Sequence, residues 1–298
     1  MTSGVPGKRP GSKRPGKEGA ASARPSGPAQ GAATPASPAQ PGRARLRARL
    51  RGLLLPAAVV ATLEGVVRAG IVPSHLMPAP SELLLTFEYL AHGPLWKHIG
   101  ASALRVACGF ALGTLLALLV GALVGLSRRA EDFLEPTFQA LRAIPSLAWV
   151  PLLLMWLGID ETSKITLIAI GAFFPVYMNL VAGIRNVDRK LVEVGDMYGF
   201  SAARRAGRIL LPAARPYLFT GLRNGLSMSW LCVVAAELLA ATQGIGYLLT
   251  DGREVSRPDL VLAAIITLAL LGKTSDTLLK ALEKRALRWR DTFAGREA

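Results

Sequence analysis

The chain has 298 residues, of which 51% are hydrophobic, and it carries 35 Lys and Arg against 20 Asp and Glu, for a formal charge of +15. Its mean hydropathy of +0.36 excludes an ordinary soluble domain. The basic residues lie in the tails and between apolar runs, so they do not form the folded basic surface that nucleic acid requires. The composition predicts a membrane protein whose charge lies in its loops.

The N-terminal segment, residues 1–42, is rich in Gly, Pro, Ala and Ser with scattered Lys and Arg. Such a segment cannot bury enough apolar surface to offset its conformational entropy, so we expect a disordered basic cytoplasmic tail. It has no apolar stretch near its start and does not resemble a secretory signal. Arginines that suit an anionic membrane surface lead into the first apolar run: Arg43, Arg45, Arg47, Arg49 and Arg51.

Six apolar runs follow, each near the length of about 20 residues that crosses a bilayer. They cover residues 53–72, 99–126, 137–157, 163–184, 216–240 and 260–282. We therefore expect an all-α integral membrane protein with six transmembrane helices within residues 43–290 and a cytoplasmic C-terminal tail at 291–298. The first run contains Glu64 and Arg68, which lie four residues apart on one helical face and can pair.

Loop charge predicts the orientation. The tail, the segments after the second and fourth runs, and the C-terminal end are rich in Lys and Arg. The other loops hold only Lys97, Lys164, Arg253 and Arg257. Because basic loops stay inside, both termini should be cytoplasmic.

The second run contains two pairs of glycines spaced four apart, which let helices approach closely in lipid. They are Gly109 with Gly113, and Gly121 with Gly125. We favour packing within one subunit over a dedicated dimer seam. Prolines that free backbone carbonyls and predict kinks interrupt the third and fourth runs: Pro145, Pro151 and Pro175.

Nothing in the sequence indicates catalysis, a metal or a cofactor. The histidines His75, His92 and His98 fall in one outside loop without metal-site spacing. We expect Cys108 and Cys232, which lie in apolar runs, to be packing residues. Gly272, Lys273 and Thr274 end like a phosphate-binding loop, but Thr267 stands where that loop needs Gly. We expect Lys273 to pair with Asp276 there instead.

The segment from Arg185 to Arg215 is too patterned for a simple connection. Apolar residues recur at helical spacing on both sides of Gly199, where a tight turn between helices favours positive φ. Ser201 can cap the second helix, and Pro212 limits it. The pattern predicts a short amphipathic helical hairpin on the cytoplasmic face, able to fill a groove of a partner.

The same segment resembles the signature of binding-protein-dependent ABC importer permeases. That signature reads Glu-Ala-Ala, three residues, Gly, nine residues, Ile, one residue, Leu-Pro, and it is matched by Glu193, Gly199, Ile209, Leu211 and Pro212. Val194 and Gly195 stand in place of the two alanines. The resemblance covers about residues 53–290. It implies the type I ABC importer permease fold, with the hairpin as a coupling element between spans four and five.

Within that family the chain most resembles permeases for aliphatic sulfonates, taurine and nitrate, and the sulfonate permeases most of all. The resemblance is carried by Val72–Leu83, Leu141–Glu161, Ala235–Thr250 and Leu271–Arg290. Besides the lipid bilayer, it implies three protein partners: an ABC ATPase subunit that hydrolyses ATP, an extracytoplasmic substrate-binding protein, and a second permease subunit, by default an identical one. The chain itself is not expected to be an enzyme.

Polar residues inside the predicted spans are candidates for the pathway, or for buried pairs. They are Arg105, Arg142, Asn179, Arg223, Asn224 and Glu237. For Glu237 we favour a structural role, paired with Arg223 or Arg105, because a negative group is a poor ligand for an anion. The segment Gln243–Tyr247 lies outside and could contact the binding protein.

Two other classes remain open from sequence alone. A permease of the same family could import taurine, nitrate or a pyrimidine precursor, because selectivity rests largely with the binding protein. A stand-alone ion-coupled carrier would show internal repeats with broken helices at matched positions and would leave the hairpin signature unexplained. An intramembrane enzyme would need a nucleophile with a base, or a metal pair, inside the spans, and none is visible.

Overall fold

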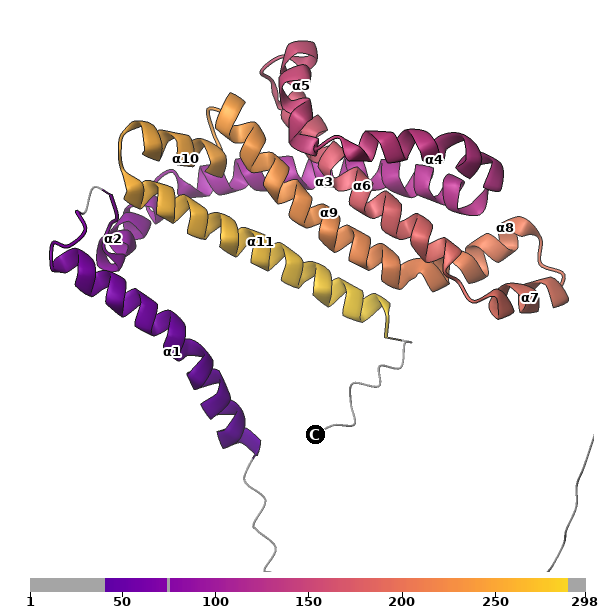
Figure 1. Cartoon of the computed structure of the whole chain (residues 1–298), viewed down its shortest axis with the longest axis horizontal. Coiled ribbons are helices and arrows are strands. Elements are labelled where there is room, and N and C mark those ends of the chain that lie inside the picture. Colours follow the sequence, from indigo (N-terminus) through magenta and orange to yellow (C-terminus); the bar gives the residue numbers. More distant parts are fainter. Residues whose placement is uncertain (1–40, 74–75, 289–298) are drawn as a thin grey trace, which may run out of the picture. The chain divides into compact units, whose positions relative to one another are not determined.

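The computed structural model describes residues 41–73 and 76–288, and over those residues every regular element is a helix (Figure 1). The chain divides into two units, Met1–Leu53 and Leu54–Ala298. The predicted C-terminal tail, 291–298, lies outside the described residues. So do residues 1–40 of the predicted N-terminal tail, because the description begins with α1 at Pro41.

The helices follow one another with short connections. They are α1 (Pro41–Arg68), α2 (Pro80–Ala91), α3 (Leu95–Leu126), α4 (Arg128–Ala143), a 3-10 turn (Ser146–Trp149), α5 (Val150–Leu157), α6 (Glu161–Arg185), α7 (Arg189–Met197), α8 (Ala202–Arg205), a π turn (Ala206–Leu210), α9 (Leu211–Ala240), α10 (Ile245–Glu254) and α11 (Pro258–Ala286). The short helices α2 and α10 fall in segments that we expected to be loops.

Three helices match predicted spans and are long and apolar enough to cross a membrane: α3, α6 and α11. The fifth predicted span lies within α9, whereas the first overlaps α1 but runs four residues beyond its end at Arg68. Both helices are long but carry charged residues inside the predicted runs. The pair predicted in the first run is present, because Arg68 Nε lies 2.7 Å from Glu64 Oε1.

The third predicted span, residues 137–157, is wrong as a single helix. Helix α4 ends at Ala143, and the segment Ser146–Leu157 leaves it at an angle of 86°. The break lies at Ile144 and Pro145. A residue before proline is forced out of the helical region, and Ile144 has φ −82° and ψ 119°. The described part of the chain therefore contains three helices that are long and apolar enough to span a membrane, or four spans if the bent pair forms one.

Helix α6 is the centre of the bundle and packs along both α3 and α9 (Figure 1). The predicted glycine pairs of α3 make this possible. A Cβ at Gly109 would lie 2.6 Å from Ile168 on α6, and one at Gly113 would overlap the Ala169 carbonyl. Farther along, Gly125 faces Ile184 in the same way. The prediction that these glycines pack within one subunit is confirmed.

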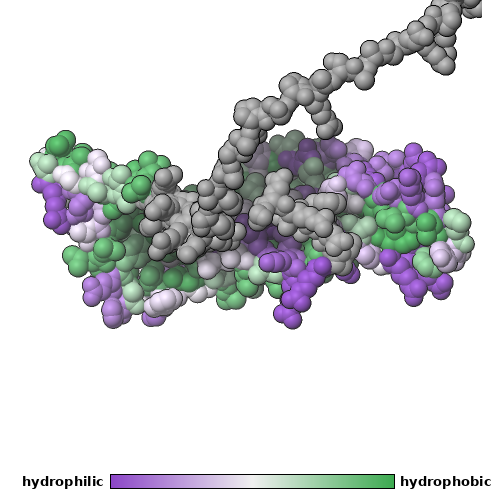
Figure 2. Space-filling model, turned by 90° about the horizontal axis from the view of Figure 1, so that it is seen from below, coloured by the Kyte–Doolittle hydropathy of each residue, from purple (hydrophilic) through white to green (hydrophobic). Residues whose placement is uncertain are grey.

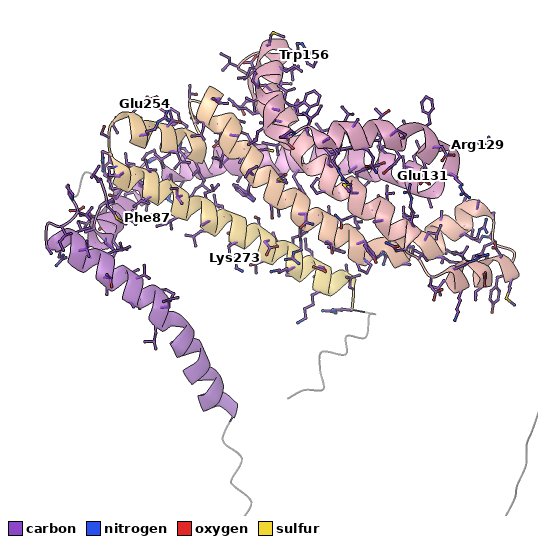
Figure 3. The ribbon with its side chains drawn as sticks, viewed as in Figure 1. Phe87, Arg129, Glu131, Trp156, Glu254 and Lys273 are labelled. Atoms are coloured by element: carbon purple, nitrogen blue, oxygen red, sulfur yellow. The ribbon has the colours of Figure 1, made fainter. Side chains whose placement is uncertain are left out.

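Much of the surface of the second unit is apolar, as lipid contact requires. Exposed side chains of α3 include Leu104, Leu115 and Leu119. In Figure 2 hydrophobic side chains spread over the helical region, while hydrophilic residues gather at the end where Figure 1 shows α7 and α8. Trp156 lies near the tip of α5, which projects from the other helices (Figure 3), and is 65% exposed.

Candidate functional site

The predicted hairpin consists of α7, a turn and α8. Asp188 caps α7 by accepting a hydrogen bond from the Lys190 amide at 2.9 Å. The turn is made at Gly199, whose φ of +65° is readily adopted only by glycine. Ser201 does precede α8, but its side chain makes no capping hydrogen bond, so that detail of the prediction is wrong. The chain then passes through the π turn into α9, where Pro212 lies in the first turn.

Contacts between the two arms stiffen this hairpin. Gly195 is buried, and a Cβ there would lie 2.6 Å from Cδ1 of Ile209. An ion pair joins Arg205 to Asp196 across the turn. Phe200 lies beneath two guanidinium groups at 5.8 and 5.9 Å, those of Arg204 and Arg208. Of the signature residues, Ile209 therefore has a packing role, and Gly195 makes room for it.

The other side of α7 presents apolar side chains to solvent. Leu191, Val194, Met197 and Tyr198 are all exposed, Met197 by 86%. We call these four residues the α7 apolar face. Glu193 lies beside it and pairs with Arg189 at 3.1 Å, with both side chains largely exposed. An exposed apolar surface next to charged residues is typical of a docking surface.

A second arrangement lies inside the bundle, where α3, α6 and α9 meet. Arg105 on α3 donates through Nη1 to Glu237 Oε1 on α9 at 2.7 Å. Glu237 also accepts from Ser102 Oγ at 2.8 and 2.9 Å and from the Gly246 amide at 2.8 Å. Its side chain is fully buried, and three kinds of donor compensate for the cost of removing a carboxylate from water.

The start of α6 completes this arrangement. Glu161 receives two hydrogen bonds from Arg105, Nε to Oε2 at 2.6 Å and Nη2 to Oε1 at 2.7 Å. Lys164, one turn later, donates to Glu161 Oε1 at 2.9 Å. We call Arg105, Glu161, Lys164 and Glu237 the charge cluster. Two cations balance two carboxylates, so the cluster is formally neutral.

The charge cluster also fixes the segment that follows α9. Arg105 donates to the Gln243 carbonyl at 2.6 Å, and the Gly244 amide donates to His98 Nδ1 at 3.1 Å. Gly244 has φ +132°, and a Cβ there would overlap the Glu237 carboxylate. The segment Gln243–Tyr247, which we expected to contact a partner, is thus held in one conformation.

The predicted pathway residues are not gathered at one place. The structure brings together Arg105 and Glu237, whereas Arg223 pairs with Asp276 at 2.9 Å and with Glu283 at 3.9 Å. Of the two partners expected for Glu237, Arg105 is therefore confirmed and Arg223 is wrong. Asn179 donates to the Pro175 carbonyl at 2.8 Å, one turn earlier on the same helix, so its amide is bound within α6.

The remaining polar candidates lie on exposed surfaces. Arg142 Nη1 lies 2.8 Å from the Met178 sulfur, and Asn224 is exposed. The pair expected between Lys273 and Asp276 is wrong, since Asp276 binds Lys280 at 3.0 Å and Arg223. The helical spacing offered both choices, and only the packing of α9 on α11 decides between them.

Two other expectations have clear outcomes. Cys232 is fully buried in the apolar core, as predicted, whereas Cys108 is exposed, so its predicted packing role is wrong. Within residues 41–73 and 76–288, no group of three or more His, Cys, Asp or Glu side chains could hold a metal ion.

Sequence reasoning missed Ser102, Glu161 and Lys164 as members of a site. Lys164 was noted only as a loop charge. The spacing of three between Glu161 and Lys164, next to the predicted fourth span, was the signal that could have indicated their pairing.

Comparison with known proteins gives consistent results. Residues 110–288 match the family described as binding-protein-dependent transport system inner membrane component. The chain is 42% identical over 257 residues to the putative aliphatic sulfonates transport permease protein of Bacillus subtilis, covering 86% of this chain and 93% of that one. The Escherichia coli protein of that name is 40% identical, covering 84% and 95%. The taurine transport system permease protein of Escherichia coli is 35% identical, covering 77% and 84%.

Proposed function

Because the chain belongs to the family of binding-protein-dependent transport system inner membrane components, and is therefore a multi-pass permease subunit of an ABC importer, we propose that it carries a small organic anion, in the first place an aliphatic sulfonate. Two relatives at 40% and 42% identity bear that name, and both are covered nearly in full. Taurine is the second candidate, because the taurine permease also aligns over most of its length.

The α7–α8 hairpin is the proposed docking element for the ATPase subunit. The observation that carries this proposal is the α7 apolar face, which has no partner among the described residues although its apolar side chains are large. A groove on a globular partner would remove these side chains from water. The buried contact of Gly195 with Ile209 and the ion pair of Asp196 with Arg205 would let the hairpin move as one body.

Importer function also requires partners on the other side of the membrane and a complete pathway. We propose that two copies of the chain pair, each crossing the membrane six times, and that an extracytoplasmic binding protein delivers the solute. The proposed orientation places α7, α8 and both termini in the cytoplasm, which agrees with the distribution of Lys and Arg. Each ATP-driven movement of the hairpin would then be transmitted directly into α9, which follows it without a loop.

The test is co-purification of the chain with its cognate ATPase subunit, comparing wild type with Met197→Asp. The new carboxylate would have to enter an apolar groove, so the ATPase should be lost and sulfonate uptake by the reconstituted importer should stop. The matched control is Arg189→Gln, which changes the net charge equally on the same helix but lies on a different side of it from Leu191, Val194 and Tyr198.

The control should retain the ATPase. If Met197→Asp retains the ATPase as wild type does, the hairpin is not the docking element. If the purified chain transports sulfonate without any ATPase, the alternative of a stand-alone ion-coupled carrier takes its place. Competition of uptake by taurine and by nitrate distinguishes the candidate solutes.

A further inference from the structure

The two carboxylates of the charge cluster differ sharply in exposure. Both bind Arg105, but the Glu237 side chain is 0% exposed, whereas the Glu161 side chain is 56% exposed. Glu237 is enclosed by Ser102, Arg105 and a backbone amide, so solvent cannot reach it. The position that Glu161 occupies is therefore one that a small molecule in solution could also occupy.

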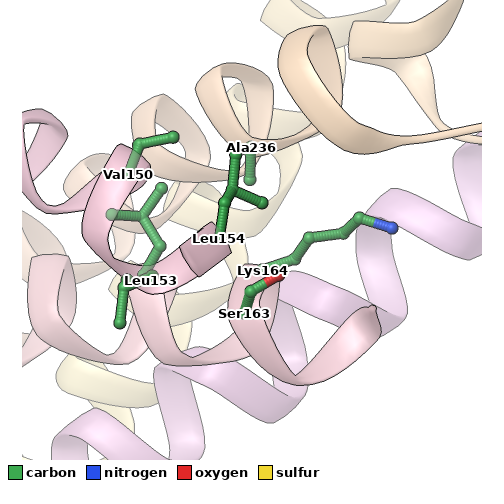
Figure 4. A pocket seen from close by; sticks show the side chains of 7 residues that line it. Val150, Leu153, Leu154, Ser163, Lys164 and Ala236 are labelled. Carbon is green, nitrogen blue, oxygen red and sulfur yellow. The ribbon is translucent and has the colours of Figure 1, made fainter. Parts of the chain in front are cut away.

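The cations on either side of Glu161 are buried. The exposed fraction of the side chain is 8% for Arg105 and 6% for Lys164. In Figure 4 the stem of Lys164 leaves a group of apolar side chains that includes Leu154 and Ala236, and its nitrogen points away from them. Neither cation can easily turn into water. Lys164 is paired with Glu161, and Arg105 is held by Glu161 together with Glu237, so both are stabilised by a negative group at the position of Glu161.

We propose that Arg105 and Lys164 form a binding site for a small oxyanion of the sulfonate class, and that the Glu161 carboxylate is its internal, displaceable ligand. Arg105 presents two N–H groups to two carboxylate oxygens at 2.6 and 2.7 Å, and sulfonate oxygens can accept the same pair. Lys164 supplies a third donor. The choice of a sulfonate as ligand rests on the proposed function, whereas the anion site itself does not.

The local backbone allows Glu161 to leave. It is the first residue of α6, and the three residues before it are not helical. Gly158 in this connection has φ +76°, and Ile159 is 71% exposed. The carboxylate can therefore rotate into solvent without breaking a helical hydrogen bond, while Arg105 and Lys164 stay fixed by their surroundings.

The test removes the internal ligand by Glu161→Gln and measures the thermal unfolding midpoint of the purified full chain. Sodium methanesulfonate replaces sodium gluconate, a bulkier anion, at constant ionic strength. The variant should unfold at a lower temperature than wild type in gluconate and recover by about 3 °C or more in methanesulfonate. Wild type should respond little, because Glu161 competes, and adding Lys164→Met to the variant should abolish the response.

Asp276→Asn is the matched control, because Asp276 also bridges an arginine and a lysine, Arg223 at 2.9 Å and Lys280 at 3.0 Å. Those cations are 35% and 47% exposed, so water solvates them and no anion dependence should appear. If Glu161→Gln shows no more anion dependence than Asp276→Asn, the proposal is wrong.

Should Glu161→Gln fail to fold in gluconate, Glu161→Asp provides the second variant, since its shorter side chain weakens the contact but keeps the charge. It should show a smaller response to methanesulfonate, and the absence of any response would overturn the proposal. These measurements need neither the ATPase nor transport, so failure of the importer proposal would leave their outcome readable.

Discussion

At the scale of single residues, the pairing of Arg105 with Glu237 places two full charges inside an apolar bundle. Such a pair is tolerated only when each group keeps several hydrogen bonds, because desolvation otherwise exceeds the Coulomb attraction. Glu237 meets this condition with Ser102 and Arg105 of α3 and with Gly246 in the first turn of α10. The carboxylate thus joins α9 to α3, which is distant in sequence, and to α10, which follows it.

We expect Glu237→Gln to lower the free energy of unfolding by about 3 kcal/mol. The buried guanidinium of Arg105 would lose one of its two carboxylate partners, and the new NH2 group, itself a donor, would face the donors that now bind Glu237. Reversible unfolding of the solubilised chain in denaturant measures the loss. Methanesulfonate should not restore the stability, because the position of Glu237 is closed to solvent. Arg189→Gln, which breaks a largely exposed pair, is the control and should have little effect. A loss as small as that of the control would show that Glu237 is not important for stability.

At the scale of elements, the α7–α8 hairpin departs from the family signature at Gly195, and this departure affects how its two arms pack. The family signature has alanine where this chain has Gly195, and the neighbouring Ile209 matches the signature. In this chain Cδ1 of Ile209 fills the space that the alanine methyl group would occupy. The fit of the two arms therefore depends on the pair of residues and not on either one alone.

Gly195→Ala should therefore strain the hairpin, and Ile209→Val should relieve that strain, because valine lacks the Cδ1 atom that the new methyl group would meet at 2.6 Å. Overpacking by one methyl group costs about 1 kcal/mol, which corresponds to about fivefold weaker ATPase binding. The affinity for the ATPase subunit measures the effect in both single variants and the double variant. If the double variant binds no better than Gly195→Ala, the contact with Ile209 does not set the shape of the hairpin.

The same scale shows what sequence could and could not predict about the elements. Helices α3 and α6 follow from long apolar runs, and the turn at Gly199 follows from its position between two helical patterns. The bend in the third run could not be predicted in this way, because hydropathy is a sum over residues and carries no information on the direction of the helix axis. Two helical segments bent by 86° therefore have the same mean hydropathy as one straight helix. Pro145 was the only local signal of the bend, and a proline in a span often gives only a modest kink.

At the scale of the whole molecule, the charge cluster marks the limit of prediction from one sequence. Arg105 and Glu237 were each identified as costly polar residues in a span, but their pairing depends on which helices are neighbours. Close contact of α6 with both α3 and α9 brings them within reach, and glycines such as Gly113 permit that contact. A pattern along the chain predicts the helices, whereas the site arises from packing between them.

The bent pair of α4 and α5 also decides the topology of the whole chain. If residues 128–157 cross the membrane once, the connection at Ile159 lies outside and the α7–α8 hairpin lies inside. If they re-enter on the same side, every later segment is inverted. The inverted arrangement would place the seven basic residues of segment 185–215 outside, against the tendency of basic loops to remain in the cytoplasm.

Labelling of single cysteines in intact cells with a membrane-impermeant maleimide distinguishes the two arrangements. The variants are made in a cysteine-free background, at positions that are all more than half exposed. We expect three of them to react in intact cells: Trp96→Cys, Ile159→Cys and Val255→Cys. The fourth, Met197→Cys, should react only after permeabilisation. A re-entrant segment would leave Trp96→Cys reactive but exchange the behaviour of the other three. That result would place the α7 apolar face on the side of the membrane where no ATPase is present, and coupling through the hairpin would be impossible.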